Sequence, residues 1–335
     1  MAATLEQRVD LTRANTLRLP CTADIGARPR TPDELRQVLD TCRENEWPVT
    51  LLGGGSNVLL PEHLPGAAIT LEFDQWWIER RGDGGVAYVG AGVHWHTLVM
   101  TLAKRGWWGL ENLALIPGRC GAAPVQNIGA YGVELGDCLE GVQVMALDSR
   151  RVYWLSREQC ELAYRDSIFK RELSGKVAIL RLALRLSRTG APKLGYGDLA
   201  QRVTSEATPL QVAKAVCSTR REKLPDPNVL ANAGSFFKNP VVSDATAQTL
   251  RTRYPDMPSF AQPDGRYKLA AGWLIDQCGL KGQRFGAFGV HERQALVMVH
   301  FGGGSRVELL DVARRLVETV ESRFGVRLEP EPRRL

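Results

Sequence analysis

Helical spacing of hydrophobic residues marks five stretches of the chain. The clearest begins at Thr31, where Thr31-Pro-Asp-Glu34 has the pattern of a capping box with proline at the first helical position. Apolar residues then recur at helical intervals from Leu35 to Cys42. The same spacing predicts four more helices: from Trp95 to Leu102, from Thr208 onward, over 270–277, and over 305–324.

Short apolar or alternating runs predict the strands. They are 49–52, 58–60, 86–89, 142–147, 152–155, 180–186 and 295–301. The segment from Gly106 to Gly136 has neither pattern, and its glycine, alanine and aromatic content favours a functional loop over disorder. No internal repeat is visible, so we expect an α+β or mixed chain of at least two domains, with a boundary near Thr208.

The charge balance narrows the possible partners. The chain has 335 residues, with 43 Lys+Arg against 37 Asp+Glu and a net charge of +6. Because basic residues are scattered among acidic ones, a pocket for small polyanions fits better than nucleic-acid binding. Seven cysteines without a C-x-x-C indicate neither a disulfide framework nor a zinc site. No apolar run is long enough for a membrane span, and the N-terminus lacks the apolar core of a secretory signal, so we expect a cytoplasmic protein.

The two commonest nucleotide-binding motifs are absent from the sequence. Gly90-Ala-Gly92 precedes a predicted helix, but Trp95 stands where a third glycine would complete a dinucleotide fingerprint. No P-loop sequence occurs either. His94 and His96 are the only close histidine pair, and residues two apart on a helix do not face one another. This pair therefore favours a packing or surface role over a metal site.

Two glycine-rich segments are candidates for ligand binding. Gly53-Gly-Gly-Ser-Asn57 could present backbone N–H groups to a phosphate, or could equally be a tight connection between strands. The loop Gly118–Gly132 favours the first interpretation, because small residues let a large flat ligand approach the backbone. Two further segments also stand out, one polar and the other unusually apolar for a surface loop. For Ala163–Ser167 residue type alone favours a helix end with a surface ion pair, and 232–240 could be a turn and a strand.

Eight segments in chain order carry a resemblance to a known family. They are Gly53-Gly-Gly-Ser-Asn57, Ile116-Pro-Gly118, Gly121-Ala-Ala-Pro-Val-Gln-Asn-Ile-Gly-Ala-Tyr-Gly132, Ala163-Tyr-Arg-Asp-Ser167, Tyr196-Gly-Asp-Leu199, Lys223-Leu-Pro-Asp-Pro227, Gly234-Ser-Phe-Phe-Lys-Asn-Pro240 and Leu328-Glu-Pro-Glu331. Together they resemble UDP-N-acetylenolpyruvoylglucosamine reductase over nearly the whole chain. The tyrosine of the fifth segment is similar to that of the family's type I branch.

The resemblance implies an α+β fold, with a two-part FAD-binding domain of the vanillyl-alcohol-oxidase type and a smaller α/β substrate domain. The implied boundaries are 1–72 and 73–207 for the FAD-binding subdomains, 208–325 for the substrate-binding domain, and 326–335 for a segment returning to the active site. FAD, held non-covalently, and NADPH are the implied cofactors. The residues expected to hold FAD are Gly53, Gly54, Gly55, Ser56, Asn57, Ile116, Pro117, Gly118, Gly121, Ala122, Gln126, Asn127, Gly129, Ala130, Tyr131 and Gly132.

The implied reaction turns UDP-N-acetylglucosamine enolpyruvate into UDP-N-acetylmuramate for peptidoglycan synthesis, and so serves cell-wall biogenesis, cell shape and cell division. Hydride passes from NADPH by way of FAD to the terminal carbon of the enolpyruvyl ether, and the adjacent carbon is protonated. By resemblance, Arg165 and Glu331 stabilise the charge that develops on the substrate carboxylate, and Ser235 delivers the proton. Matching positions for the UDP-sugar are Tyr196, Lys223, Asn239 and Gln294. No metal, nucleic acid or membrane span is implied, and we expect a monomer.

Two positions depart from the family's pattern. Glu331 is followed by Pro332, where the family usually has a β-branched residue. Glu329 lies two residues earlier, on the same side of an extended segment, and remains an alternative, although motif alignment favours Glu331. His300 stands where related sequences often carry asparagine, which we interpret as a harmless change at a strand end.

Two other functions compete with this interpretation. The first is a flavin oxidase of the same superfamily that acts on another carbohydrate or alcohol, which leaves the segment Gly234–Pro240 unexplained. The second is a non-catalytic regulator that binds a UDP-sugar. The presence of all three candidate catalytic residues, Arg165, Ser235 and Glu331, disfavours the second.

Overall fold

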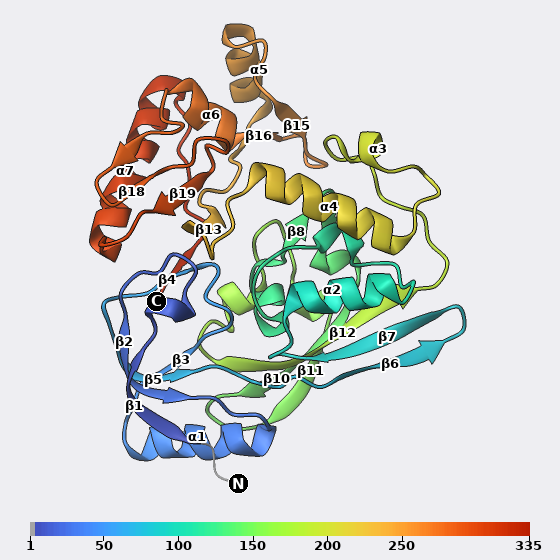
Figure 1. The fold of residues 1–335 in the computed structure, drawn as a ribbon, viewed down its shortest axis with the longest axis vertical. Helices are drawn as coiled ribbons and strands as arrows, with labels where there is room; N and C mark the ends of the chain where they lie inside the picture. The colour runs from blue at the N-terminus through green and yellow to red at the C-terminus, as the bar shows by residue number, and fades with distance from the viewer. Residues whose placement is uncertain (1–3) are drawn as a thin grey trace. The chain divides into compact units, whose positions relative to one another are not determined.

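The computed structural model describes residues 4–335, which divide into two compact units. Unit 1 contains residues up to Val9 together with 22–55 and 63–222. Unit 2 contains 10–21, 56–62 and 223–335. The division falls inside the predicted phosphate loop, after Gly55. Each unit is described separately below, and Figure 1 labels the elements of both.

Unit 1 begins with a four-stranded sheet covered by one helix. The strand order is β1 (Leu5–Asp10), β2 (Thr22–Ala27), β5 (His63–Ile69), β3 (Val49–Leu51), and the last three strands run parallel. Helix α1 (Pro32–Glu44) packs on this sheet through buried residues including Leu35 and Leu39. The Thr31 side chain accepts from the Glu34 N–H, so the predicted N-cap is confirmed.

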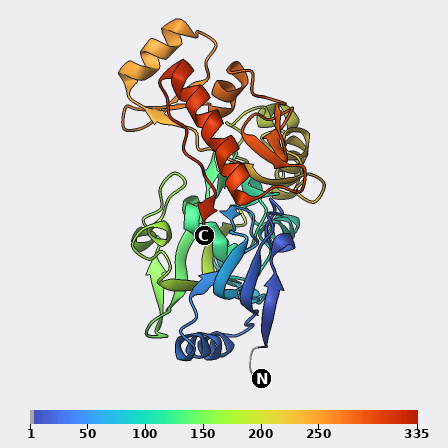
Figure 2. The ribbon, with the colours of Figure 1, turned by 90° about the vertical axis from the view of Figure 1, so that its left-hand side faces the viewer.

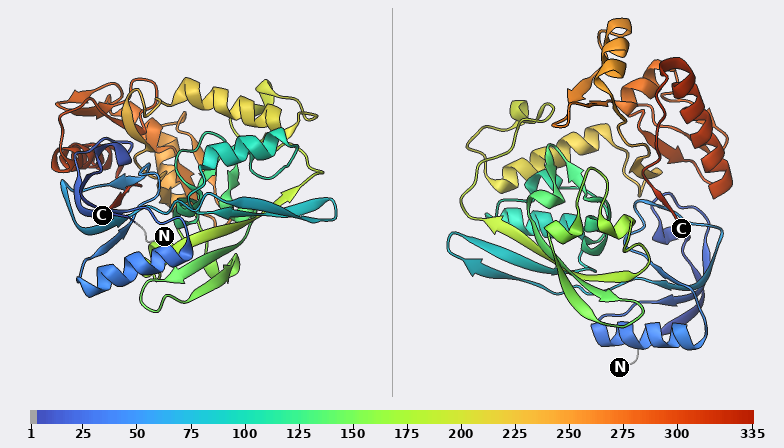
Figure 3. Two further views of the ribbon diagram at one scale, coloured as in Figure 1. Left: turned by 60° about the horizontal axis from the view of Figure 1, so that its bottom comes forward. Right: turned by 180° about the vertical axis from the view of Figure 1, so that it is seen from behind.

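A five-stranded antiparallel sheet forms the rest of the unit 1 core. In order, its strands are β11 (Val152–Ser156), β10 (Leu139–Ala146), β12 (Val177–Ser187), β7 (Gly84–Gly90) and β6 (Trp76–Arg81). Helices α2 (Trp95–Lys104) and α4 (Pro209–Lys223) lie on one face of the sheet and share its hydrophobic core (Figures 1 and 3).

The segment between α2 and β10 is irregular, as the sequence predicts. It contains short elements only, which are η2 (Glu111–Leu113), η3 (Cys120–Gln126), β8 (Gly129–Ala130), β9 (Val133–Glu134) and η4 (Leu135–Asp137). Further short elements of unit 1 are η5 (Glu158–Cys160), η6 (Ile168–Lys170) and α3 (Leu199–Arg202). Buried side chains such as Leu113, Cys120 and Leu135 join this segment to the core, so a packed scaffold supports the candidate loop.

Unit 2 contains a four-stranded antiparallel sheet in the order β13 (Ala231–Ser235), β19 (Val297–His300), β18 (Phe288–Val290), β17 (Arg284–Phe285). Helix α7 (Arg306–Phe324), the long red helix of Figure 2, contacts β18 and α6 (Ala271–Gln277). The remaining elements are η1 (Thr12–Ala14), β4 (Val58–Leu59), β14 (Val241–Val242), α5 (Asp244–Arg253), β15 (Ser259–Ala261), β16 (Tyr267–Leu269) and β20 (Arg333–Arg334).

The five predicted helices and seven predicted strands are all present, and the α+β fold class is confirmed. The capping box at Ser305 forms as predicted, and α7 ends at Gly325 in a left-handed conformation. The interpretation of Ala163–Ser167 as a helix end is wrong, because this segment is a turn between η5 and η6. Within the described residues 4–335, no helix is long and apolar enough to cross a membrane.

Candidate functional site

Three backbone segments of unit 1 approach one another closely because the facing residues are glycines. An ideal Cβ built on Gly54 would lie 2.8 Å from the Gly118 Cα, and one on Gly53 would lie 2.9 Å from the Ala122 Cβ. A Cβ on Gly121 would lie 2.6 Å from the Cβ of Ala91, in the loop that follows β7. We call these segments, 53–55, 91–92 and 118–122, the glycine cradle. Its geometry excludes larger side chains from the two predicted FAD loops.

The cradle fits a phosphate-bearing cofactor. Within residues 4–335, the backbone N–H groups of Gly53, Gly54 and Gly55 donate to no protein acceptor. Successive free backbone donors of this kind form an anion-binding concavity. These residues therefore fit the pyrophosphate of FAD. Gly55 has a φ of 63° and Gly118 a φ of 112°, conformations that further favour glycine at both positions.

Cys120 lies within the cradle but is unsuited to covalent attachment. Its side chain is fully buried, and burial raises the pKa of its thiol well above the ordinary value. A buried, protonated thiol is a poor nucleophile.

His96 is also engaged within the fold, since its Nδ1 accepts from the Leu115 N–H at 3.0 Å. No cluster of potential metal ligands occurs among residues 4–335.

Arg165 occupies the tip of a tight turn in unit 1. The backbone N–H and carbonyl groups of Ala163 and Asp166 bond to each other reciprocally, at 3.1 Å each. Arg165 has a φ of 55°, a left-handed conformation that is uncommon for an arginine. The predicted surface ion pair exists, but it is made by Arg171, which bonds to Asp166 and Glu161. A strained conformation at a predicted catalytic residue is typical of functional sites.

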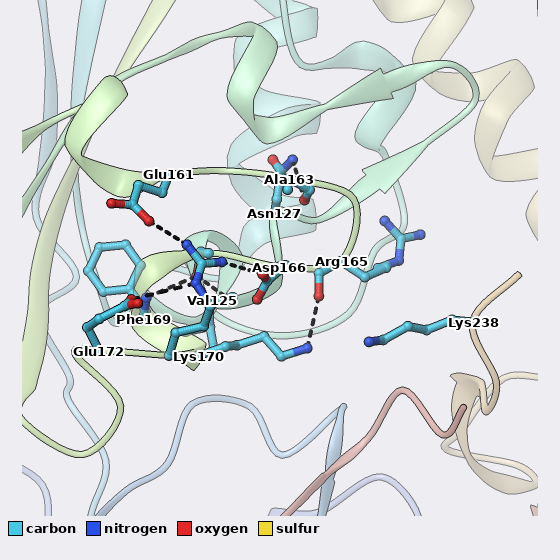
Figure 4. Close-up of polar contacts among 12 residues, drawn as sticks. Val125, Asn127, Glu161, Ala163, Arg165, Asp166, Phe169, Lys170, Glu172 and Lys238 are labelled. Carbon is cyan, nitrogen blue, oxygen red and sulfur yellow. Dashed lines mark hydrogen bonds and ion pairs between the residues drawn. The ribbon is translucent and has the colours of Figure 1, made fainter. Parts of the chain in front are cut away.

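The guanidinium of Arg165 lies against the glycine-rich loop. Its Nη2 donates to the Gly129 carbonyl at 3.1 Å, and its Cζ stands 5.3 Å from the Tyr164 ring centroid. A Cβ on Gly129 would come within 3.2 Å of the Arg165 Nη1, so a glycine leaves room for the guanidinium. Figure 4 shows Lys170 donating to the Arg165 carbonyl, a bond of 2.9 Å. The arginine is thus placed beside the predicted cofactor loop.

Two tyrosines of unit 1 form an aromatic edge of the same loop. The rings of Tyr131 and Tyr196 meet edge to face with centroids 6.0 Å apart, and Tyr196 is 53% exposed. Asn112 holds this edge in place by donating to the carbonyl oxygens of Tyr131 and Lys193. Burial raises the pKa of the Tyr131 hydroxyl. Predicted cofactor and substrate residues are therefore neighbours here.

Sequence reasoning missed Arg220. It lies on α4, and its buried Nε has no hydrogen-bond partner among residues 4–335. Burial lowers the pKa of the Arg220 guanidinium, and the nearby positive charge of Arg165 lowers it further. Tyr131 raises this pKa, but by less than burial lowers it. No sequence motif contains Arg220, because its burial near Tyr131 and Arg165 is visible only in the folded structure. Two cationic side chains in this region suit an anionic ligand.

In unit 2, the structure brings together the segments that carry Ser235 and Glu331. Ser235 ends β13, opposite Val297, after an irregularity in pairing at Gly234. The next residue, Phe236, accepts from the Glu331 N–H at 2.8 Å, and Lys238 N–H donates to Glu329 at 2.9 Å. We call this pairing of 236–238 with 329–331 the C-terminal ladder. Arg165, in contrast, belongs to unit 1.

The ladder distinguishes the two candidate carboxylates. Glu329 pairs with the Lys238 ammonium, and its side chain is 70% exposed. Glu331 is only half-buried and lies next to Asn57, whose Nδ2 approaches the Glu331 carbonyl at 3.5 Å. Pro332 removes no needed donor, because the N–H groups in use are those of Glu331 and Arg333. The geometry favours Glu331 over Glu329.

Asn239 and Gln294 each lie against the first turn of α6. Asn239 Oδ1 accepts from the Ala271 N–H at 3.0 Å, and a Cβ on Gly272 would lie 3.1 Å from Gln294 Oε1. Lys223 is exposed at the end of α4.

His300 is buried, and its ring joins the Leu17 carbonyl to the Gly304 N–H, so the substitution expected to be harmless has a structural role.

The remaining predicted cofactor residues lie on the same loops. Ile116 and Ala130 pack against the unit 1 core, and Gln126 ends η3. Gly132 follows Tyr131, and its Cβ position faces Tyr196 at 3.6 Å. Pro117 precedes Gly118 in chain order, while Ser56 and Asn57 open the short unit 2 segment 56–62.

Residues 23–153 match the FAD binding domain, and residues 226–335 match the C-terminal domain of UDP-N-acetylenolpyruvoylglucosamine reductase. The reductase of Cupriavidus pinatubonensis is 46% identical over 324 residues, covering 96% of each chain, and that of Chromobacterium violaceum is 48% identical over 293 residues, covering 86% of each. The crystal structure of the Thermus caldophilus reductase covers 99% of both chains with a TM-score of 0.69 at 27% identity.

The fold and the glycine cradle define a flavin-dependent oxidoreductase built on an FAD-binding domain of the vanillyl-alcohol-oxidase type. A solvent-stable cholesterol oxidase shares the fold at 13% identity, with a TM-score of 0.52. Identities above 40% over at least 86% of the chain identify the family within this class. The chain belongs to the UDP-N-acetylenolpyruvoylglucosamine reductase family.

Proposed function

We infer that this chain reduces UDP-N-acetylglucosamine enolpyruvate to UDP-N-acetylmuramate, a step of peptidoglycan precursor synthesis, with FAD as bound cofactor and NADPH as reductant. It is an oxidoreductase that acts on a carbon–carbon double bond. The single observation that best supports this particular reaction is the C-terminal ladder, because it brings Ser235 and Glu331 onto adjoining segments. A flavin oxidase of another substrate has no need of this pair.

FAD, when bound, supplies the hydride acceptor and donor that no protein side chain provides. The residues that would hold it are those of the glycine cradle and the loops around it, over 53–57 and 116–132, apart from the side chain of Asn127. The unused N–H groups of Gly53 to Gly55 support a role at the pyrophosphate. Cys120 is buried and unreactive, so we propose that the cofactor is held without a covalent bond.

Arg165 would bind the substrate carboxylate. Its planar guanidinium can form two parallel hydrogen bonds to a carboxylate, and its charge would stabilise the negative charge that develops there as hydride adds to the terminal carbon. The left-handed turn around Arg165 fixes where the side chain leaves the backbone. An arginine held in one place needs little reorganisation during the reaction.

Ser235 and Glu331 would complete the chemistry from unit 2. Glu331, in its protonated form, would donate a hydrogen bond to the same carboxylate. Ser235 would give its hydroxyl proton to the carbon next to the one that receives hydride, and would regain a proton from a neighbouring group or from water. A serine hydroxyl is a weak acid, so this transfer requires the strongly basic carbon that hydride addition produces.

Four further residues would hold the rest of the substrate. Tyr196 and Lys223 would contact the UDP-sugar, with the Lys223 ammonium near the diphosphate. Asn239 and Gln294 each lie against the first turn of α6 and would bind polar groups of the sugar. Asn239 uses only its Oδ1 within residues 4–335, which leaves its amide donors for a ligand.

We propose that the enzyme works as a monomer in the cytoplasm, where NADPH and UDP-sugars are made. Its seven cysteines are all unpaired, and six of them are buried, which suits a reducing compartment. The predicted boundaries at 72, 207 and 325 remain our proposal for the domains. These boundaries differ from those of the two compact units, because residues 10–21 and 56–62 belong to unit 2.

Two variants of Ser235 test the proposed reaction. Stopped-flow absorbance would follow flavin reduction by NADPH and then flavin reoxidation by the enolpyruvyl substrate. Ser235→Ala should leave the first rate near the parental value and slow the second by roughly 10²–10⁴-fold, as for a lost general acid. Ser235→Cys should recover part of the loss, because a thiol can also donate a proton. Reoxidation of Ser235→Ala at the parental rate would exclude this serine as the proton donor.

A further inference from the structure

We propose that Asn127 is a positioning residue for Arg165, and that its side chain acts through the turn 163–166 rather than by touching the cofactor. The inference rests on the proposed function, since Arg165 is taken to bind the substrate carboxylate. Asn127 lies in the glycine-rich loop and was expected from the sequence to bind FAD. Its side chain is 2% exposed, and its contacts point to a different role.

Every hydrogen-bonding atom of the Asn127 amide has a protein partner. Its Nδ2 donates to Glu134 Oε2 at 2.7 Å and to the Ala163 carbonyl at 3.1 Å, and its Oδ1 accepts from the Gly136 N–H at 2.9 Å. Figure 4 shows Asn127 beside Ala163, two residues before Arg165. The amide therefore links the glycine loop, the segment 134–136 and the start of the turn.

Asparagine is the residue type that this position requires. Asn127 has a φ of 46°, a left-handed conformation that asparagine tolerates better than most residues. Two donors and one acceptor are needed on a short side chain, and aspartate has no donors in its ionised form. A substitution at Asn127 would leave buried polar groups without partners, a costly outcome inside a packed loop.

The far end of the turn has its own anchor. Ser167 is fully buried, its Oγ donates to the Val125 carbonyl at 2.6 Å, and the same oxygen accepts from the Phe169 N–H at 3.2 Å. Asn127 and Ser167 therefore tie both ends of the turn to the same short stretch of loop, 125–127. Between these two anchors stands Arg165, with its left-handed backbone.

This arrangement explains how a strained turn keeps one conformation. A non-glycine residue in the left-handed region costs free energy, and it persists only where surrounding contacts determine it. The bond from Asn127 to the Ala163 carbonyl is one such contact. Loss of this bond would let the turn relax and move the guanidinium, and a displacement of about 1 Å can lower a rate on the order of 10²-fold.

Asn127→Asp is the selective variant, because it keeps the acceptor for Gly136 but removes both donors. It also sets a second carboxylate beside Glu134. The double variant Asn127→Asp/Glu134→Gln removes that repulsion and can restore a bond between the two side chains, but not the bond to Ala163. We expect the double variant to recover thermal stability, while flavin reoxidation by the substrate stays slowed by roughly 10- to 100-fold.

Asn15→Asp is a matched control from unit 2. Asn15 is also 2% exposed, its Nδ2 donates to the carbonyls of Leu11 and Leu19, and its Oδ1 accepts from the Leu19 N–H. This variant breaks a network of the same kind without touching the Arg165 turn. It should lower stability as much as Asn127→Asp does and leave reoxidation, per bound flavin, at the parental rate.

Two measurements decide the proposal. Hydrogen–deuterium exchange should show faster exchange of the Ala163 and Asp166 N–H groups in Asn127→Asp, with or without flavin. When Arg165 is already alanine, adding Asn127→Asp should slow reoxidation by less than about 3-fold relative to Arg165→Ala alone. The effects of two substitutions are not additive when the two residues act as a unit. Unchanged exchange in the turn, or additive losses, would overturn the proposal. A parental reoxidation rate for Arg165→Ala alone would instead refute the role of Arg165 in the proposed function, and the exchange result would still decide whether Asn127 holds the turn.

Discussion

Gly54 stands so close to Gly118 that a Cβ atom on the first would lie 2.8 Å from the Cα of the second. Real Cβ atoms do not approach backbone to this distance, so the contact requires glycine at 54. The two residues belong to the two loops that the sequence predicted to hold FAD. Their contact makes the loops one structure, in which a side chain added to either loop is expected to disturb the other.

Gly54→Ala should therefore weaken FAD binding. The added methyl group must displace the backbone at Gly118, and the donors of the cradle shift with it. We expect at least a tenfold rise in the FAD dissociation constant, measured from the ratio of flavin to protein absorbance after dialysis. Gly82→Ala is the control. A Cβ there meets nothing within 4 Å, so the variant should keep a full complement of flavin despite its positive φ of 60°.

Arg165→Lys should separate the two half-reactions. Lysine keeps the positive charge but loses the planar fork that binds a carboxylate with two hydrogen bonds. Flavin reduction by NADPH should stay within about 2-fold of the parental rate, and reoxidation by the substrate should fall by roughly 10²-fold. Equal losses in both steps, recorded by stopped-flow absorbance, would show that Arg165 has a structural role instead.

The two glutamates of the C-terminal segment make a matched pair. Glu331→Gln should slow reoxidation by roughly 10–10³-fold, because an amide donates more weakly to the developing negative charge than a carboxylic acid does. Glu329→Gln removes only an ion pair whose carboxylate is largely exposed, so its rate should stay close to the parental one. A larger effect at Glu329 than at Glu331 would reverse the assignment.

The sequence predicted well what depends on neighbouring residues. Helix α7 could be placed because its start, Ser305 with Glu308, and its end, Gly325, are both local signals. The strand β5 was missed, since Pro65 and Gly66 interrupt the apolar pattern of a strand that the parallel sheet nevertheless pairs. Tertiary pairing overrode the local signal there.

The turn at Arg165 shows why the site itself could be predicted only in part. Residue types alone favoured a helix end, but the conformation depends on bonds from Asn127 and to Val125, residues 36 and 42 positions away from their partners. The preference for Glu331 over Glu329 likewise depends on Phe236 and Asn57, which no local pattern connects to the C-terminus. The resemblance to a known family pointed to Arg165 and Glu331, but only the fold shows the contacts that surround them.

Non-covalent attachment of FAD gives a simple test. Cys120 is the cysteine of the cradle segment 118–122, and burial makes its thiol unreactive, as argued above. Acid precipitation of the yellow protein should release all of the flavin into the supernatant, and a pellet that stayed yellow would contradict the proposal. Cys120→Ala removes the thiol without burying a hydroxyl, and its flavin should be released in the same way as that of the parent.

Glu111 should make the stability of unit 1 depend on pH. This carboxyl is 5% exposed, and its Oε2 accepts from the Gly109 N–H at 2.7 Å. Burial raises the pKa of Glu111, and the backbone hydrogen bonds and the charge of Lys193 offset this only in part. An acid with a raised folded pKa favours folding most when the pH is below its unfolded pKa. That contribution is lost as the pH rises through the folded value.

At pH 7, then, Glu111 lowers stability relative to acidic pH, because the folded protein ionises this buried carboxyl less readily than the unfolded chain does. Glu111→Gln should remove this cost while its amide oxygen still accepts from the Gly109 N–H. We expect the variant to melt higher than the parent at pH 7, by roughly 2–4 °C for each kcal/mol gained. The advantage should shrink toward pH 4, where the parental carboxyl is protonated. Scanning calorimetry of both proteins between pH 4 and pH 8 gives the comparison, with Glu79→Gln, an exposed position on β6, as control. The opposite result would be a Glu111→Gln variant with a lower melting temperature than the parent at pH 7, and a smaller difference at pH 4. That result would mean that the charged form of Glu111 stabilises the fold.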